Sequence, residues 1–91
     1  MIYRINSGVE VEKTGLKEDD DFVVYDSNNE SVFVVNSIGG DILLKLMNGS
    51  SMEELLSKLR AEYLLSEDAY NDVASFIDDM YKKGIILIDE N

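Results

Sequence analysis

The stretch of residues 31–49 (SVFVVNSIGGDILLKLMNG) changes from a strand pattern to a helix pattern within two residues, and this change constrains the fold most. Residues 32–35 are β-branched or aromatic, which is typical of a strand. Asn36 and Ser37 are both suited to cap a helix. The apolar residues that follow at helical spacing are Ile38, Ile42, Leu43, Leu46 and Met47. Gly49 stands where a helix C-terminal glycine belongs. Elements before this stretch can therefore extend a sheet, and elements after it can pack as helices.

Three further strands are predicted upstream. Alternating apolar and polar residues predict short strands at Ile2–Ile5 and Val9–Lys13. Residues 22–25 predict a third strand. The polar turn at residues 26–30 then returns the chain, so that this strand pairs with Ser31–Val35 as a hairpin. The first half of the chain therefore predicts a small antiparallel sheet of three strands, whose last strand leads directly into the first helix.

The second half of the chain is predicted to be helical. Ser50 and Ser51 are followed three residues later by Glu53 and Glu54, so two overlapping capping boxes predict the start of a second helix. Ser66 caps a third helix, which Gly84 ends. Residues 85–88 then form a short apolar strand, or wing. The length of 91 residues predicts one domain over residues 1–91, and its fold class is α+β.

The third helix has a wide apolar arc. Placed at 100° per residue, its apolar side chains cover roughly 160°, more than the roughly 100° of an ordinary core-facing stripe. The side of the arc that suits packing holds Phe76, Ala69 and Met80. The other side has two amphipathic rings that suit a partly exposed recognition surface, and it holds Tyr70, Ala74, Ile77 and Tyr81. A wide core helix with two boundary tyrosines explains the same pattern equally well.

The net charge of −11, from 19 acidic and 8 basic residues, argues against nucleic acid and anionic membranes as partners. It is compatible with a neutral or basic partner. The chain has no Cys, which fits a reducing compartment. It shows no signal peptide, and its longest apolar runs are four residues, too short to span a membrane. We therefore expect a cytoplasmic protein.

Motifs for catalysis or for a cofactor are missing from the sequence. The chain has neither His nor Cys, which removes the commonest general base and the thiol nucleophile. The acidic run at residues 18–21 lacks the spacing of a calcium loop, and the glycines do not form a phosphate-binding loop. We expect no catalysis by this chain alone, no metal and no cofactor.

Five segments together resemble a known family. They are VVNSIGGDIL at residues 34–43, MNGSSMEEL at residues 47–55, Leu59-x-x-x-Tyr63, Asp72-Val73-x-x-Phe76-Ile77 and Gly84-Ile85-Ile86. Their order and spacing over residues 9–88 resemble pyrroloquinoline quinone biosynthesis protein D. Members of that family are also called recognition elements for ribosomally synthesised and post-translationally modified peptides (RiPP recognition elements). The chain differs at Leu43, where an aromatic residue often stands, and at Met80, which replaces a usual Leu.

The resemblance implies a small winged helix-turn-helix domain that binds the leader segment of a ribosomally made precursor peptide. In the family, the leader adds as a strand to the third strand of the sheet and lies against the third helix. Applied to this sequence, the strand residues of the site are Ser31, Val32, Phe33, Val34 and Val35, and the helix residues are Tyr70, Val73, Ala74, Ile77 and Tyr81. The partners implied are the leader and a separate modifying enzyme, often a radical S-adenosylmethionine enzyme.

Two other functions fit a winged-helix pattern. The first is a DNA-binding transcription factor, and the second is a non-catalytic structural subunit of an enzyme complex. A DNA reader should cluster Lys and Arg on its recognition helix, whereas the predicted third helix presents Asp72, Asp78 and Asp79 on its polar face. The fold alone does not separate a peptide-binding protein from a structural subunit.

The charge pattern predicts that the protein does not bind DNA. A titration against mixed-sequence duplex at low salt, where electrostatic binding is strongest, should show no association. Binding with a dissociation constant in the micromolar range or below would support the alternative hypothesis of a DNA-binding transcription factor.

Overall fold

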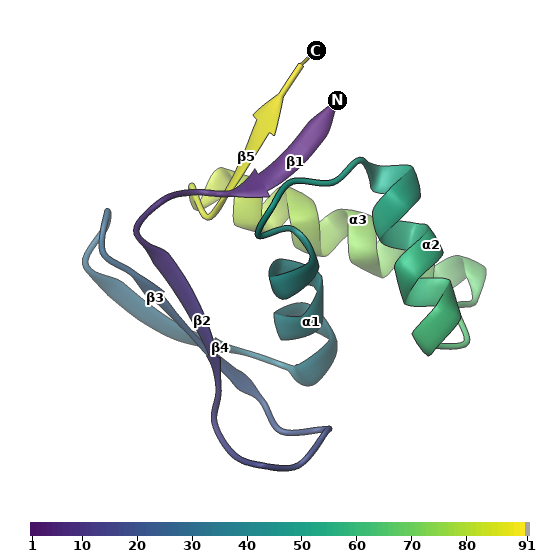
Figure 1. Cartoon of the computed structure of the whole chain (residues 1–91), viewed down its shortest axis with the longest axis horizontal. Coiled ribbons are helices and arrows are strands. Elements are labelled where there is room, and N and C mark those ends of the chain that lie inside the picture. The colour runs from purple at the N-terminus through teal and green to yellow at the C-terminus, as the bar shows by residue number, and fades with distance from the viewer. Residues whose placement is uncertain (91) are drawn as a thin grey trace.

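The strand-to-helix junction joins the sheet to the helices in the computed structural model, which describes residues 1–90 (Figure 1). The elements in chain order are β1 (Ile2–Ile5), β2 (Val9–Lys13), β3 (Phe22–Asp26), β4 (Ser31–Val35), α1 (Ser37–Lys45), α2 (Met52–Glu62), α3 (Glu67–Lys82) and β5 (Ile86–Asp89). The α+β class and the expected order of strands, helices and C-terminal strand are confirmed.

The junction between β4 and α1 is closed by Asn36. Its side-chain Oδ1 accepts a hydrogen bond of 2.8 Å from the backbone N–H of Gly39, which satisfies one of the free donors at the helix start. The helix ends at Lys45, and Gly49 follows with a φ of +87°, a conformation that glycine adopts without strain. The sequence-based boundaries of this stretch are therefore confirmed to within about two residues.

β2, β3 and β4 form the three-stranded antiparallel sheet, in that order. Phe22 lies opposite Val35, and Val24 lies opposite Phe33. Because side chains alternate along a strand, these residues share the inner face, which α1 covers (Figure 1). The opposite, outer face carries the remaining alternate residues and has no helix over it (Figure 1).

β1 pairs with β5 instead of joining this sheet. Ile2 lies opposite Asp89 and Ile5 lies opposite Ile86, so the N- and C-terminal strands form a separate antiparallel ribbon (Figure 1). The chain turns away after β1 at Gly8, whose φ is +88°. The expected wing is thus one strand of a two-stranded ribbon, and its partner comes from the other end of the chain.

Serine residues cap α2 and α3. Of the two overlapping capping boxes, the structure uses the second, since Ser51 Oγ accepts from the N–H of Glu54 at 3.1 Å. Ser50 is buried and pairs with Tyr3 of β1 through two backbone hydrogen bonds of 2.8 and 2.9 Å. Ser66 caps α3 as expected. The pairing of Ser50 therefore ties the ribbon to the start of α2.

The core lies between the inner sheet face, the three helices and the ribbon. Its buried apolar residues come from every element. They are Ile5, Val9, Phe22, Val24, Val35, Ile42, Leu43, Leu46, Leu55, Leu59, Val73, Ile77, Met80, Ile85 and Ile86. None of the helices within residues 1–90 is long and apolar enough to cross a bilayer.

Gly40 allows α1 to lie directly on the sheet. A Cβ atom at this position would overlap the Phe22 side chain of β3, so no other residue fits without moving one of the two elements. Both residues are buried. The short distance between α1 and β3 therefore depends on glycine, which has no side chain, at position 40.

We predict that Gly40→Ala lowers the free energy of unfolding by about 1–3 kcal/mol, the usual cost of overpacking a core. The sign is diagnostic, because Gly→Ala within a helix otherwise stabilises by roughly 1 kcal/mol. Denaturant unfolding followed by circular dichroism measures the change. Gly15→Ala, in an exposed loop where the new Cβ meets only the end of the Asp20 side chain, is the control. Equal stability of Gly40→Ala and the unsubstituted protein would contradict the close packing of Gly40 against Phe22.

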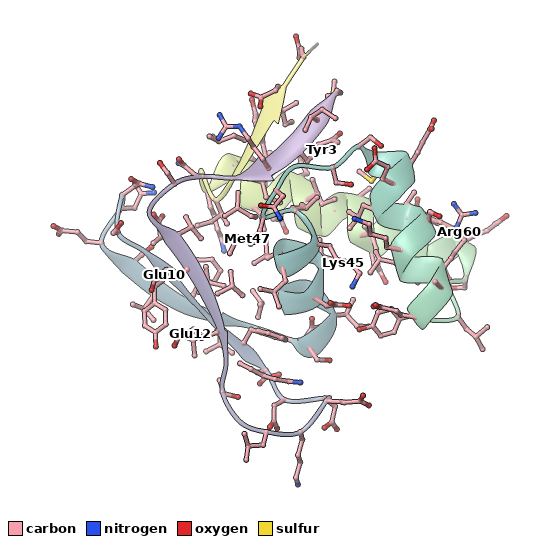
Figure 2. All side chains as sticks on the ribbon, in the orientation of Figure 1. Tyr3, Glu10, Glu12, Lys45, Met47 and Arg60 are labelled. Atoms are coloured by element: carbon pink, nitrogen blue, oxygen red, sulfur yellow. The ribbon has the colours of Figure 1, made fainter. Side chains whose placement is uncertain are left out.

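A partly buried polar cluster joins α1 to α2. Lys45 Nζ lies 2.9 Å from Asp41 Oδ1 and 2.8 Å from Glu62 Oε2, and the Tyr63 hydroxyl donates to Asp41 Oδ2 at 3.0 Å. Figure 2 shows Lys45 reaching from α1 into the space beside α2. Partial burial raises the pKa of Asp41, but the hydrogen bonds from Lys45 and Tyr63 outweigh it, so the pKa lies below its ordinary value of 3.8.

The lowered pKa of Asp41 makes this cluster sensitive to acid. Its stabilising contribution is present above pH 3.8 and is lost as the pH falls through the lower, folded-state pKa. We predict that Lys45→Met costs about 1–2 kcal/mol at pH 7 and makes unfolding less dependent on pH below 3.8. Lys58→Met, at an exposed position of α2, is the control. If both variants unfold alike at every pH, the cluster does not hold the two helices.

Candidate functional site

β4 forms one edge of the sheet. Within residues 1–90 it pairs with β3 alone, so the backbone groups on its other side are not used by the sheet. Such an edge is a template for an added strand. Val32 and Val34 are 63% and 58% exposed on the outer face, while Phe33 and Val35 turn inward. The edge can therefore accept an extended peptide through its backbone.

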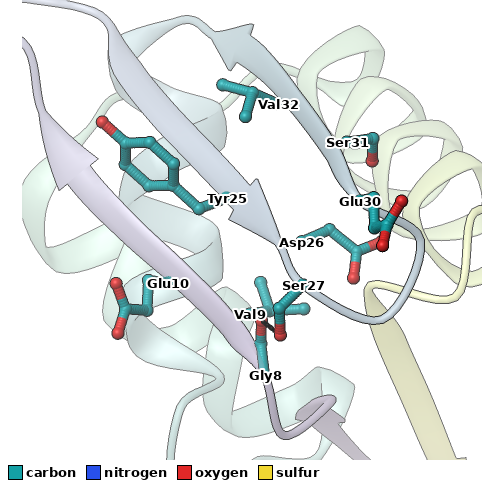
Figure 3. Close-up of a pocket in the computed structure, with 9 residues that line it drawn as sticks. All are labelled: Gly8, Val9, Glu10, Tyr25, Asp26, Ser27, Glu30, Ser31 and Val32. Atoms are coloured by element: carbon teal, nitrogen blue, oxygen red, sulfur yellow. Dashed lines mark hydrogen bonds between the residues drawn. The ribbon is translucent and has the colours of Figure 1, made fainter.

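α3 runs beside this edge, as the close-up in Figure 3 shows. At its C-terminal end, Lys83 Nζ lies 4.8 Å from the centroid of the Phe33 ring of β4. Farther along, the Phe76 ring packs on the first turn of α1, where it comes within 3.0 Å of the place that a Cβ on Gly39 would take. These two contacts set α3 along β4 and against the start of α1.

A hollow of about 350 Å³ opens between the start of α1 and the first half of α3. Its lining is mostly apolar, with one carboxylate, and comprises Asn36, Ile38, Gly39, Ile42, Leu65, Ala69, Asp72, Val73 and Phe76. Because Asn36 directly follows β4, the hollow continues from the end of the free edge. We call it the α1–α3 hollow. It is suited to receive apolar side chains of a chain that lies along β4.

The structure places the predicted strand residues along the edge. Ser31, Val32 and Val34 are exposed, Phe33 is partly buried and Val35 is buried. Val73 of α3 is 4% exposed and lines the α1–α3 hollow. Ile77, which the sequence placed on the partly exposed side of α3, is 3% exposed and belongs to the core. That exposure expectation for Ile77 is wrong.

The other predicted helix residues lie on a different flank of α3. The Arg60 guanidinium of α2 lies 5.7 Å from the centroid of the Tyr70 ring. At 100° per residue, Ala74 and Tyr81 fall within about 40° of Tyr70, whereas Phe76 falls about 120° away. Ala74 and Tyr81 are exposed. The tyrosine flank therefore follows the α2 side of the helix, and none of its members lines the α1–α3 hollow.

Of the four α3 residues that line this hollow, sequence reasoning placed Val73 in the site but missed Ala69, Asp72 and Phe76. Phe76 and Ala69 were assigned to packing, and Asp72 was assigned to the solvated face. Ile38 lines the hollow from α1 and is 43% exposed. The sequence carried a signal for this residue, since it is an apolar residue in the first turn of a short helix. The periodicity of α3 gives the width of its apolar arc, but not which flank meets β4.

A second, larger hollow of about 610 Å³ lies between the β2–β3 loop, the start of α1 and the end of α2. Four carboxylates line it, from Glu18, Asp19, Asp41 and Glu62, of which the last two already bind Lys45. Among residues 1–90 no three potential ligands come together as a metal-binding group. No residue of β4 or α3 lines this hollow, so the β4 edge and the α1–α3 hollow form the candidate site.

The molecule is thus a small α+β domain in which three helices and a terminal strand ribbon lie on the inner side of a three-stranded sheet with a free edge beside α3. The chain belongs to the PqqD family: the family model for "Coenzyme PQQ synthesis protein D (PqqD)" matches residues 21–86. The matched region includes β3, β4 and all three helices, which are the elements that build the candidate site.

Two solved structures share this fold. The first, "Lasso peptide synthetase B1 complexed with the leader peptide", is 22% identical with a TM-score of 0.71, and the alignment covers 94% of this chain and 98% of that one. The second, "TbiB1 in Complex with the TbiA(beta) Leader Peptide", is 18% identical with a TM-score of 0.75 and covers 97% and 99% of the two chains. No curated protein matches the chain at a significant level.

Proposed function

We propose that the protein binds the leader segment of a ribosomally made precursor peptide and presents it to a separate modifying enzyme. The observation that carries this proposal is the free β4 edge beside α3, which continues into an apolar hollow. Family membership supports it, as do two structural neighbours whose titles name bound leader peptides. The site is proposed to be Ser31–Val35 together with the α1–α3 hollow.

Strand addition explains how such a site recognises a peptide. The leader backbone pairs with the free N–H and C=O groups of β4, which gives affinity with little dependence on sequence. Successive leader side chains point to opposite faces. One set faces α3, where Phe33, Phe76 and the α1–α3 hollow receive it and give selectivity. The other set continues the outer face of the sheet.

We place the chemistry on the partner enzyme and not on this chain. The sequence has neither His nor Cys, so it lacks the residues most often used as base and nucleophile. The family resemblance points to an enzyme such as a radical S-adenosylmethionine enzyme, and ribosomal synthesis of the precursor points to the cytoplasm. The acidic face of α3, with Asp72, Asp78 and Asp79, opposes a role in DNA binding.

We predict that Ile38→Asp weakens leader binding by about 1–3 kcal/mol, the scale of a poorly solvated polar group in an apolar site. The variant should still fold, because an acidic residue in the first turn of a helix is favourable. Ala74→Asp adds the same charge at an exposed position of the tyrosine flank and should bind normally. Calorimetry with the cognate leader measures affinity, and thermal melting checks the fold. Equal affinity of the two folded variants for the leader would exclude the α1–α3 hollow from the binding site.

Backbone recognition is tested on the peptide instead of the protein. Leader peptides N-methylated at one set of alternate residues should lose tenfold or more in affinity, because the methyl groups remove the N–H donors that face β4. Peptides methylated at the intervening residues should lose much less. Tolerance of methylation at both sets would contradict strand addition, even if the leader binds elsewhere on the protein.

A further inference from the structure

The outer face of the sheet carries an exposed apolar patch. The proposed peptide site uses the backbone edge of β4 but not the side chains of this patch. Val32 and Val34 of β4 lie directly opposite Tyr25 and Val23 of β3, and all four side chains point away from α1. We call these four residues the outer patch. Figure 3 shows Tyr25 and Val32 side by side on neighbouring strands.

The rim of the outer patch is acidic. Glu10 lies opposite Tyr25, and Glu12 lies opposite Val23. Both carboxylates project from β2 on the side of the sheet away from the helices (Figure 2). Glu30 adds a third carboxylate from the β3–β4 turn. The outward positions of the three strands hold no Lys or Arg, since Lys13 lies opposite Phe22 and shares the inner face.

A hollow of about 540 Å³ joins the patch to this rim. Its walls include Glu10, Tyr25, Glu30 and Val32 (Figure 3). The turn beside it is held by Asp26, a buried residue whose carboxylate accepts from Asn28 N–H at 3.0 Å and from Asn29 Nδ2 at 2.8 Å. The hollow is therefore formed by the fold before any partner arrives.

The hollow fits a Lys or Arg side chain. The aliphatic stem of such a residue can lie on Tyr25 and Val32, with its cationic group over the tyrosine ring or beside Glu10 or Glu30. The rest of the outer patch suits apolar neighbours of that residue. The complementary surface is thus apolar with basic residues around it.

We propose that the outer patch docks the modifying enzyme through an apolar surface flanked by Lys or Arg, an inference that rests on the proposed function. A protein that presents a peptide must hold peptide and enzyme at once, and the β4 edge is taken by the leader. A second copy of this chain is a poor occupant, because each copy carries a net charge of −11 and the same acidic rim.

This placement couples the two binding events. The leader strand extends the sheet beyond β4, so its outward side chains continue the outer patch beyond Val32 and Val34. An enzyme seated on the patch then touches the protein and the leader together. Leader binding should strengthen enzyme binding, and by linkage the enzyme should strengthen leader binding by the same factor.

The experiment uses the cognate precursor leader and its modifying enzyme, with affinities measured by calorimetry and biolayer interferometry. Glu10→Lys/Glu12→Lys should weaken enzyme binding at least tenfold and leave leader binding unchanged. Glu18→Lys/Asp19→Lys makes the same charge change in an exposed loop and should stay within twofold. Tyr25→Thr, which keeps a residue suited to a strand, should also weaken enzyme binding at least tenfold.

Equal effects of the two charge variants, or no effect of Glu10→Lys/Glu12→Lys and Tyr25→Thr, would overturn the assignment while leader binding remains intact. A dimer in sedimentation that Tyr25→Thr dissolves would also overturn it, because the patch would then belong to a second copy. Failure of the unsubstituted protein to bind its leader would instead overturn the proposed function, and with it the reason for placing the enzyme here.

Discussion

The close approach of α1 to β3, where Gly40 lies under the Phe22 side chain, is the constraint on which the rest of the structure depends. It sets α1 on the inner face of the sheet. On the far side of α1, Lys45 forms an ion pair with Glu62 of α2. In the first turn of α1, the Phe76 ring of α3 packs on Gly39. The width of the α1–α3 hollow follows from this stacking, so the two adjacent glycines shape the proposed site without contributing a side chain to its chemistry.

Because side chains alternate along β4, its two faces have different roles. Phe33 and Val35 turn inward to the core and to α3, while Val32 and Val34 stay on the outer face. The backbone edge between these faces is the proposed site of the leader. One five-residue strand thus stabilises the fold, offers the proposed peptide site and forms half of the outer patch. Substitutions on the two faces should separate folding, peptide binding and enzyme docking.

Much of the fold could be predicted because its signals are local. The caps at Asn36, Ser51 and Ser66 and the glycine at Gly84 set the helix ends through short-range hydrogen bonds and backbone conformation. The pairing of β1 with β5 was not predictable, since it joins opposite ends of the chain. The orientation of α3 was also missed, because helical periodicity does not say whether Phe76 or Tyr70 faces β4. That choice depends on where α1 and α2 lie.

Strand addition to β4 is the central claim, and amide hydrogen exchange read by NMR tests it most directly. The sheet has two edges, β4 and β2, so β2 serves as the internal comparison. Adding the cognate leader should slow exchange at alternate amides of Ser31–Val35, those that do not bond β3, and leave Val9–Lys13 unchanged. Protection along Val9–Lys13, or binding that slows no amide of Ser31–Val35, would contradict the account.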